Sequence, residues 1–494
     1  MATRSSPKKS KPKTGDRKPK KRNRYIELPP LFIWGDVVAL GWRILKDGKY
    51  RLDLPRLSAD EEKMIDAVEQ RFKEAVRTKN PKTRSESQDI LKKLLHDHAY
   101  ENSIYLDSEQ AEYLSKIALL HIYGFAFLDL LLTDPEIEEI SVIGLEKPVY
   151  IYRRNSGWES VNAAFTSEGT IADVVNKMAR GIGRHITIQN PRLDAMLPDG
   201  SRLHASLPPV SGCEMTIRKF RERPFSPPEL VDSGTINIRA LALLSLIMQG
   251  DNSVLIAGNT ASGKTTTLNA LFSFVPENER VLITEETPEI NIPHSHQLRL
   301  VANREMGISL KDLVYDSLRM RPDRMIVGEV RNKEEAEALF DVILAGQARG
   351  SYATFHAQSA DEALGRLSSF GISRTDMRSI DCIVVQRRML LYDLKKRKTR
   401  EVRRIVEIAE IDDKAKLIFS HDPKKDQLIE GSLNGMIEKT AEKLGSTKAE
   451  IKDELRKRER TLRKMERKFT DFYAAVQKDF YGITIATEEK NEAD

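Results

Sequence analysis

Cysteine is scarce in this chain, and long apolar runs are missing. Only Cys213 and Cys382 occur among 494 residues, so we expect neither a disulfide framework nor a zinc site. Spanning a bilayer takes about 20 apolar residues, whereas the nearest run, residues 31–42, is shorter and contains Asp36. The basic N-terminus has no apolar stretch behind it, so no signal peptide is predicted. We therefore expect a cytoplasmic protein.

The charge of the chain is concentrated at one end. Residues 1–24 hold eleven Lys and Arg against one Asp, a net +10, so with a total of +6 the remainder carries −4. Such a tail cannot bury enough apolar surface to fold by itself, and we expect it to be disordered. Three interpretations stay open: a solvated arm, attraction to an anionic membrane surface or partner, and nucleic-acid binding. Nucleic acid is the least favoured, because no aromatic residue is interleaved with these charges.

A phosphate loop is the most specific pattern in the sequence. Residues 258–265 fit G-x-x-x-x-G-K-[ST], with an apolar strand predicted at 253–257 and a helix at 266–274. In such a loop backbone N–H groups surround a phosphate, the lysine adds positive charge, and the threonine hydroxyl binds Mg²⁺. The helix N-terminus favours the same anion. The residues expected to bind ATP with Mg²⁺ are Gly258, Asn259, Thr260, Ala261, Ser262, Gly263, Lys264, Thr265 and Thr266.

Short apolar strands alternate with helical segments on both sides of this loop. This order is typical of a parallel sheet covered by helices, the α/β class. Strands are expected at 253–257, 280–285, 324–329 and 351–355, with outer strands at 383–385 and 401–409.

Two of these strands end in carboxylates, which a nucleotide-hydrolysing site needs for the metal and for water. Glu329 follows an apolar strand and is the first candidate to organise Mg²⁺. Glu285 and Glu286 end another strand, and Glu285 is the better candidate to polarise the attacking water. The alternative for both strands is a solvated acidic cap.

Together these segments resemble the secretion ATPase superfamily of type II and type IV secretion, type IV pili and archaella. Four motifs stand in the family's order: Walker A at 258–265, an acidic box at 284–289, Walker B at 319–331 and a histidine box at 354–357. The resemblance also includes 191–194, 197–202 and 216–220, and it covers about 124–410 in all. Residues 384–388, 403–410 and the pair 480–481 look most like the archaeal branch.

The resemblance implies roles for single residues near the phosphate loop. Lys264 and Thr265 would bind phosphate and Mg²⁺, and Glu285 would be the catalytic glutamate. Glu329 would organise the metal or its water, and His356 would sense the γ-phosphate.

Arginines are implied as well. Arg202 and Arg218 look like the pair that closes over the nucleotide, from the same or a neighbouring subunit. Arg319 and Arg331 would have intersubunit roles. The family's histidine box opens with an additional histidine; an ungapped match puts Arg349 in its place here, and a one-residue shift would put Ala348 there. Whether Arg349 supplies charge to the nucleotide or is a structural replacement stays open.

The resemblance and the composition together divide a chain that is too long for one hydrophobic core. The expected segments are a basic disordered tail (1–24), a largely helical partner-binding region (25–105), an N-terminal α/β domain (106–220), a linker (221–236), a RecA-like P-loop ATPase core (237–412) and a helical C-terminal extension (413–494).

The function that the resemblance implies is that of a hexameric cytoplasmic motor. It would couple Mg-ATP hydrolysis to secretion or assembly of pilin-like subunits through a membrane platform protein, with the basic tail available to a membrane surface. An archaellum motor shares every motif and stays an alternative. A DNA-translocating ATPase is less favoured, because outside the tail only the C-terminal helical region is strongly basic.

Overall fold

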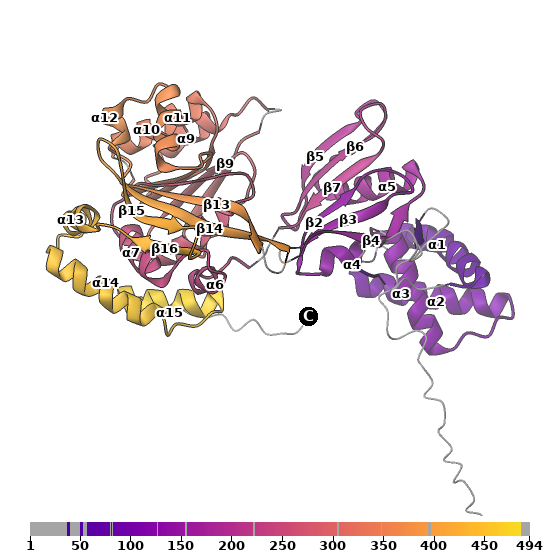
Figure 1. Cartoon of the computed structure of the whole chain (residues 1–494). Coiled ribbons are helices and arrows are strands. Elements are labelled where there is room, and N and C mark those ends of the chain that lie inside the picture. The colour runs from indigo at the N-terminus through magenta and orange to yellow at the C-terminus, as the bar shows by residue number, and fades with distance from the viewer. Residues whose placement is uncertain are drawn as a thin grey trace, which may run out of the picture. The chain divides into compact units, whose positions relative to one another are not determined.

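The structure is a computed structural model of the whole chain (Figure 1). It describes residues 37–39, 50–52, 57–79, 81, 83–125, 127–153, 156–220, 223–303, 306–346, 348–393 and 397–485. The tail predicted at 1–24 lies outside these residues. The chain divides into two compact units, Met1–Lys219 and Phe220–Asp494.

Unit 1 contains five α-helices among its described residues. They are α1 (Ala59–Lys79), α2 (Arg84–Glu101), α3 (Ser108–Tyr123), α4 (Leu128–Thr133) and, further along, α5 (Glu168–Ala179) with a 3₁₀ turn at Arg180–Ile182. The side chains of Thr83 and Asp107 cap the N-termini of α2 and α3 by accepting backbone hydrogen bonds. On α1, Ile65, Val68 and Phe72 are buried at helical spacing, and α1, α2 and α3 pack on one another through such faces.

A seven-stranded antiparallel sheet completes unit 1, in the order β1-β4-β3-β2-β7-β6-β5. Its strands are β1 (Val37–Ala39), β2 (Ile137–Val142), β3 (Pro148–Arg153), β4 (Gly157–Phe165), β5 (Arg192–Met196), β6 (Arg202–Ser206) and β7 (Glu214–Arg218). Side chains alternate between the faces: on β6 Leu203 and Ala205 are buried whereas Arg202 and His204 are exposed. This alternation places Arg202 on the open face of the sheet.

Unit 2 is built on a nine-stranded sheet in the order β10-β9-β11-β12-β8-β13-β14-β15-β16. The strands are β8 (Val254–Gly258), β9 (Val281–Glu285), β10 (Gln297–Val301), β11 (Arg324–Val330), β12 (Gly350–Phe355), β13 (Cys382–Asp393), β14 (Lys398–Ile411), β15 (Ala415–Asp422) and β16 (Gln427–Glu430). From β10 to β13 all neighbours are parallel, and β14 to β16 add antiparallel strands. The strands predicted at 253–257, 280–285, 324–329 and 351–355 are confirmed as β8, β9, β11 and β12.

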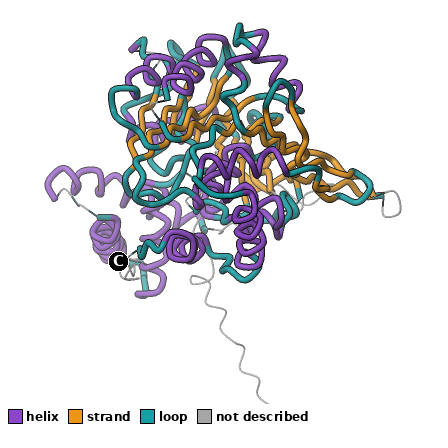
Figure 2. Tube along the Cα trace, turned by 90° about the vertical axis from the view of Figure 1, so that its left-hand side faces the viewer, coloured by secondary structure: helices purple, strands orange, loops and turns teal. Residues whose placement is uncertain are grey.

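Helices cover both faces of this sheet, as Figure 2 shows. They are α6 (Pro227–Asp232), α7 (Ile238–Gln249), α8 (Lys264–Leu271), α9 (Leu310–Ser317), α10 (Lys333–Ala345), α11 (Ala360–Ser369), α12 (Arg374–Met377), α13 (Asn434–Lys443), α14 (Lys448–Leu462) and α15 (Phe469–Tyr481). Successive residues of β8 serve two cores: Val254 and Ile256 pack with α7, α8 and the C-terminal helices, whereas Leu255 and Ala257 pack with α9 to α12. The expected α/β class, with a RecA-like core after a smaller α/β domain, is confirmed.

The linker predicted at 221–236 was wrong for part of its length. Residues Pro227–Asp232 form helix α6, which begins with a capping box between Ser226 and Glu229 and has proline in its first turn. Proline suits the first turn because no intrahelical N–H bond is needed there. The prolines therefore start a helix at this point instead of breaking the chain.

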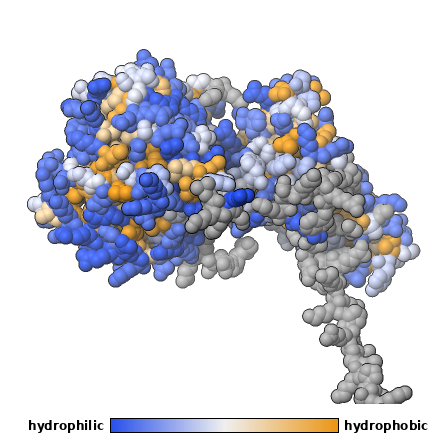
Figure 3. All heavy atoms as spheres, in the orientation of Figure 1, coloured by the Kyte–Doolittle hydropathy of each residue, from blue (hydrophilic) through white to orange (hydrophobic). Residues whose placement is uncertain are grey.

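The C-terminal extension predicted at 413–494 was wrong at its start. Residues Asp412 and Lys414 form a turn that leads β15 back beside β14, so the sheet continues through β15 and β16 before the helices begin. Asp-rich turns of this kind join adjacent strands. Beyond them the extension is helical, and the capping box at Thr447 and Glu450 opens α14 as predicted. The outer side of α14 is charged, and its region is mostly hydrophilic in Figure 3.

Candidate functional site

The phosphate loop follows the carboxyl end of β8 and leads into α8. Its backbone turns through the left-handed region at Ala261 (φ 58°) and Gly263 (φ 96°), a conformation that glycine adopts without strain. A Cβ at Gly258 would collide with the carbonyl oxygen of Gln386, and one at Gly263 would lie 2.9 Å from the Gln386 Nε2. Gly258 therefore has no room for a side chain, and Gly263 has a backbone conformation that favours glycine. The loop can thus take the close-packed form that presents backbone N–H groups to a phosphate.

Glu329 is the point at which the charged side chains of the site meet. Its Oε1 lies 2.6 Å from the Nε2 of His356 and 3.8 Å from the Nζ of Lys264. Its Oε2 accepts a hydrogen bond of 2.6 Å from the Nε of Arg331, whose guanidinium also pairs with Glu286. The structure thus brings together three residues that the sequence predicted for one site, from α8, β11 and the end of β12.

The protonation states of Glu329 and His356 follow from their surroundings. Burial raises the pKa of Glu329, but the nearby cations, first Arg331, outweigh it and lower that pKa below its ordinary value. The pKa of His356 is lowered because burial and the ammonium of Lys264 disfavour an imidazolium. At neutral pH the site therefore holds an ionised carboxylate and a neutral imidazole.

Glu285 lies at the end of the neighbouring strand β9 and is almost fully buried. Its Oε1 accepts backbone hydrogen bonds from Glu289 (2.7 Å) and Ile290 (2.8 Å), and its Oε2 lies 3.3 Å from the Nε of Arg299. Burial raises the pKa of Glu285 to about 7, although these N–H groups and Arg299 oppose the shift. A Cβ at Gly328 would be 2.9 Å from the Glu285 Cγ, so the glycine before Glu329 makes room for this carboxylate.

Glu289 is a site residue to which the sequence analysis gave no role. Its Oε2 accepts a hydrogen bond of 3.3 Å from the hydroxyl of Thr265, the expected Mg²⁺ ligand. Its carbonyl oxygen accepts from the side chain of Asn269 on α8, which docks this loop against the helix. The sequence did contain an indication of this role: Glu289 is the third acid after Glu285 and Glu286, four residues past the end of strand β9. The expected metal pair was Thr265 with Glu329, but the hydroxyl of Thr265 bonds to Glu289.

The residues present fit a phosphate with a divalent cation. The loop can present backbone N–H groups to a phosphate, and Lys264 adds a positive charge. Thr265 and Glu289 provide adjacent oxygen ligands for the cation. Mg²⁺ is usually held by one or two protein oxygens together with substrate phosphates, without a dedicated cage. Across the part of the chain that the structure describes, no group of three or more His, Cys, Asp or Glu is arranged to hold a metal ion.

A family model described as Type II/IV secretion system protein matches residues 132–470. The chain belongs to this family. Its members are ATPases, and the resemblance predicted from the sequence is confirmed.

Similar proteins include two from the archaeon Methanocaldococcus jannaschii. The uncharacterized protein MJ0900 is 32% identical over 396 residues, which are 76% of this chain and 70% of that protein. The uncharacterized protein MJ0781 is 37% identical over 243 residues, 47% of this chain and only 33% of the length of that protein. The type IV secretion system protein VirB11 of Bartonella henselae is 26% identical over 273 residues, 47% of this chain and 76% of that protein.

Solved structures with some likeness include the ATPase DotB of Legionella pneumophila, 18% identical, with a TM-score of 0.44 over 73% of this chain and 93% of that one. The pilus retraction motor PilT is 16% identical, with a TM-score of 0.42 over 73% of this chain and 94% of that one. With TM-scores below 0.5, neither likeness bears on the fold or the function of this chain.

Arg202 and Arg218, which resemble the family's nucleotide-closing arginines, lie in unit 1. They are directly opposite each other on β6 and β7, and both are exposed on the open face of the sheet. Glu139 on β2 lies opposite Arg218 on its other side. Two cations opposite each other repel, so an anion between them would be favourable.

Arg349, at the position of an additional family histidine, lies at the amino end of β12. Its guanidinium pairs with Asp251 at 3.3 Å and with the buried Glu279 at 3.1 Å. Because β12 and β8 are parallel, this end of the strand is at the sheet edge opposite the phosphate loop, which follows the carboxyl end of β8. The interpretation of Arg349 as a charge for the nucleotide was therefore wrong, and its contacts are structural. Arg319 is exposed after α9, and its expected role stays a prediction.

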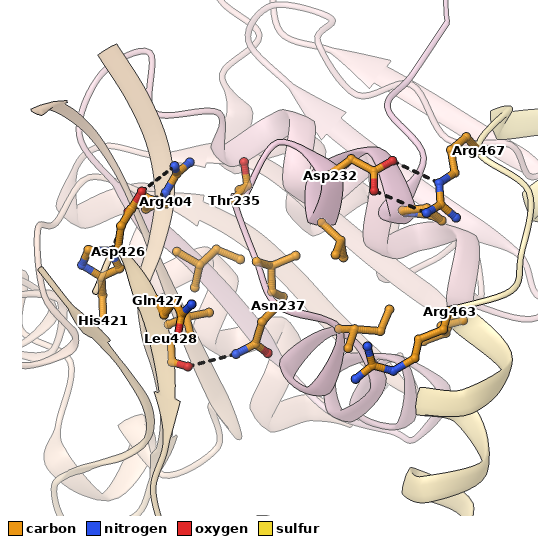
Figure 4. Close-up of a pocket in the computed structure, with 17 residues that line it drawn as sticks. Asp232, Thr235, Asn237, Arg404, His421, Asp426, Gln427, Leu428, Arg463 and Arg467 are labelled. Atoms are coloured by element: carbon orange, nitrogen blue, oxygen red, sulfur yellow. Dashed lines mark hydrogen bonds and ion pairs between the residues drawn. The ribbon is translucent and has the colours of Figure 1, made fainter. Parts of the chain in front are cut away.

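A cavity of about 520 Å³ lies elsewhere in unit 2, between α6, β14, β16 and α14 (Figure 4). Two ion pairs line it: Arg404 bonds to Asp426, and Arg467 to Asp232. None of the family's four motifs contributes a lining residue. This cavity is thus separate from the phosphate-loop site.

Helices in the part of the chain that the structure describes are all too short or too polar to cross a membrane.

Proposed function

We propose that this chain is a homohexameric motor ATPase at the cytoplasmic face of a membrane. It couples Mg-ATP hydrolysis to secretion or assembly of pilin-like subunits through a membrane platform protein. The observation that supports this most directly is the meeting of Lys264 and His356 at Glu329. That arrangement joins a phosphate-binding cation, a neutral imidazole and a carboxylate at the carboxyl ends of three parallel strands. Membership of the family, with secretion-system relatives such as VirB11, supports the cellular role.

Nucleotide binding falls to the phosphate loop. Its backbone N–H groups and Lys264 take the phosphates, and the hydroxyl of Thr265 beside Glu289 supplies metal ligands. Mg²⁺, when bound with the nucleotide, neutralises charge on the phosphates. Glu329 holds Lys264 and His356 near one another, so it organises the residues on the metal side of the site.

Glu285 accepts the proton of the attacking water in this proposal. A base works best when its pKa lies near the operating pH, and burial gives Glu285 a pKa of about 7. The hydrogen bonds from Glu289 and Ile290 fix the direction of its carboxylate. The same loop therefore positions the base and, through the side chain of Glu289, contacts Thr265.

His356 and the arginines make hydrolysis conditional. His356 is neutral and bonded to Glu329, so it can exchange that bond for one to a γ-phosphate oxygen and report which nucleotide is bound. Arg202 and Arg218 close over the nucleotide, from the same or a neighbouring subunit, and stabilise the charge of the transition state. A site that is complete only after this closure ties hydrolysis to movement.

Steady-state ATP hydrolysis with particle mass measured alongside tests the proposal. We compare the full chain with Lys264→Ala and Glu329→Gln, and use Lys333→Ala and Glu337→Gln as matched controls, because these residues form an exposed ion pair on α10 and have no assigned role in the site. A hexamer whose hydrolysis both site variants abolish, with the controls active, is the expected result. A monomer that hydrolyses ATP equally well with Glu329→Gln would contradict both the ring and the role of Glu329.

A further inference from the structure

The hairpin formed by β13 and β14 runs past the phosphate loop and beyond it. β13 pairs in parallel with β8 from Cys382 to Gln386, where β8 ends at Gly258. It then continues to Asp393, paired only with β14. Figure 2 shows this second half as a ribbon that projects from unit 2. One hairpin therefore has its first half inside the core sheet of unit 2 and its second half beyond β8.

A β-bulge lies where the two halves meet. Val385 pairs with Glu407 and Gln386 pairs with Ile405, so one residue of β14 between them has no partner on β13. A bulge bends a ribbon and increases its twist, and bulges are frequent next to active sites. Gln386 is thus placed at the bend.

Side chains and backbone of the same hairpin contact the phosphate loop. The hydroxyl of Thr267, in the first turn of α8, donates a hydrogen bond of 2.6 Å to the Oε1 of Gln386, and both side chains are at most 2% exposed. The Nε of Arg403 donates to the carbonyl oxygen of Ala261 at 3.1 Å. The side chain of Asn259 exchanges two hydrogen bonds with the backbone of Arg388, at 3.0 and 3.3 Å.

These contacts tie two points of the loop, Asn259 and Ala261, and the first turn of α8 to the hairpin. A change at any of these points therefore acts on the hairpin at its bend or just beyond it. The ladder from Arg387 to Asp393 is continuous, so the projecting half can move as one body about Gln386. Its outer part carries exposed apolar side chains, Leu390 (70%) and Tyr392 (56%), and exposed basic residues such as Arg400.

We infer that Gln386 is a positioning residue that couples the nucleotide state of the phosphate loop to the projecting half of the β13–β14 hairpin. This inference rests on the proposed ATPase function. When the loop and the first turn of α8 adjust to phosphate, the amide of Gln386 follows Thr267 and Gly263, and the ribbon tilts at its bulge. A change in the phosphate loop is thereby transmitted through the hairpin to the exposed side chains of Leu390 and Tyr392.

A thiol probe at the outer part of the hairpin tests this in the full chain. Tyr392→Cys can be labelled selectively with an environment-sensitive fluorophore, because Cys213 and Cys382 are buried and burial raises the pKa of the thiol of each. We expect the emission to differ between the ADP-bound and nucleotide-free forms. In the background of Gln386→Met or Thr267→Val most of that difference should be lost, because each variant removes the buried hydrogen bond between Thr267 and Gln386.

Binding of a fluorescent ADP analogue, measured separately, distinguishes a failure of the proposed ATPase function from a failure of the coupling. If the analogue fails to bind the parent chain, the proposed function fails. If it binds and the Tyr392→Cys emission does not respond, or responds equally in Gln386→Met and Thr267→Val, the coupling is overturned while the ATPase remains. Support requires that both variants bind the analogue and show a lower kcat at nearly unchanged KM. Thr267→Val keeps the side-chain volume, so it remains informative if Gln386→Met unfolds.

Discussion

The Nε2 of His356 lies 2.6 Å from Oε1 of Glu329. This contact joins the end of β12 to the end of β11, and Lys264 approaches the same carboxylate oxygen from α8. Because the imidazole is neutral and the carboxylate ionised, the bond is sensitive to any anion that competes for the histidine proton. In the proposed function, this bond would let the site distinguish nucleotides that carry a γ-phosphate from those that lack it.

The pKa of Glu285 predicts how hydrolysis depends on pH. With a pKa of about 7 this carboxyl is mainly protonated at pH 6 and mainly ionised at pH 8, and only the ionised form accepts a proton from water. We expect kcat to rise about tenfold between these pH values. The measurement is kcat at saturating ATP from pH 5.5 to 8.5. A profile of the same shape in Glu285→Gln would assign the titration to another group.

The same group links stability to pH. The pKa of Glu285 is raised from 4.5 in the unfolded chain to about 7, so the folded state holds its proton more tightly and stability from this group is lost as pH rises through that window. Glu285→Gln, which never ionises, should therefore gain in Tm relative to the parent as pH increases from 5 to 8. A Tm difference that stays constant over this range is the contrary outcome.

Glycines of the phosphate loop should tolerate no side chain. In Gly258→Ala the new Cβ meets the carbonyl of Gln386, and in Gly263→Ala the residue must hold φ at 96°. We expect nucleotide binding to be lost in both variants, as measured by calorimetric titration with ADP and Mg²⁺.

The matched control for these glycines is Gly365→Ala. Gly365 lies inside α11, and a Cβ added there would have no atom within 4 Å. The Gly365→Ala variant should therefore bind nucleotide normally and be more stable than the parent by about 0.5–1 kcal/mol. Normal nucleotide affinity in Gly263→Ala would show that this loop does not take the close-packed form.

Replacing Arg349 should affect stability and leave catalysis intact. Arg349→Gln removes partly exposed ion pairs to Asp251 and Glu279, which is worth about 1 kcal/mol or less. A small decrease in Tm with unchanged kcat and KM is the expected result. A large loss of kcat at unchanged Tm would instead revive Arg349 as a residue of the nucleotide site.

Much of the core could be predicted from the sequence because its requirements are local. A phosphate loop needs glycines at particular positions, and buried parallel strands need continuous apolar runs. Strand β8 and the loop from Gly258 to Thr265 could therefore be predicted from their own residues. Acids at strand ends were also visible, since a strand followed by Glu329 places that side chain at the carboxyl edge. The strands β10, β15 and β16 were missed. β10 and β16 are short strands at the two edges of the sheet, and β15, beside β16, does not alternate regularly between buried and exposed side chains.

Tertiary structure alone decided which residues on different strands contact one another. The sequence by itself determined that a phosphate loop, two acidic strand ends and His356 exist; strand order and register decided that His356 contacts Glu329, that Arg218 faces Arg202 and that Arg349 lies at the opposite edge. Contacts such as Glu289 with Thr265 join residues distant along the chain, and hydrogen-bond geometry selects them among many possible pairs. Such choices depend on how loops return to the sheet, which no local pattern of residues specifies.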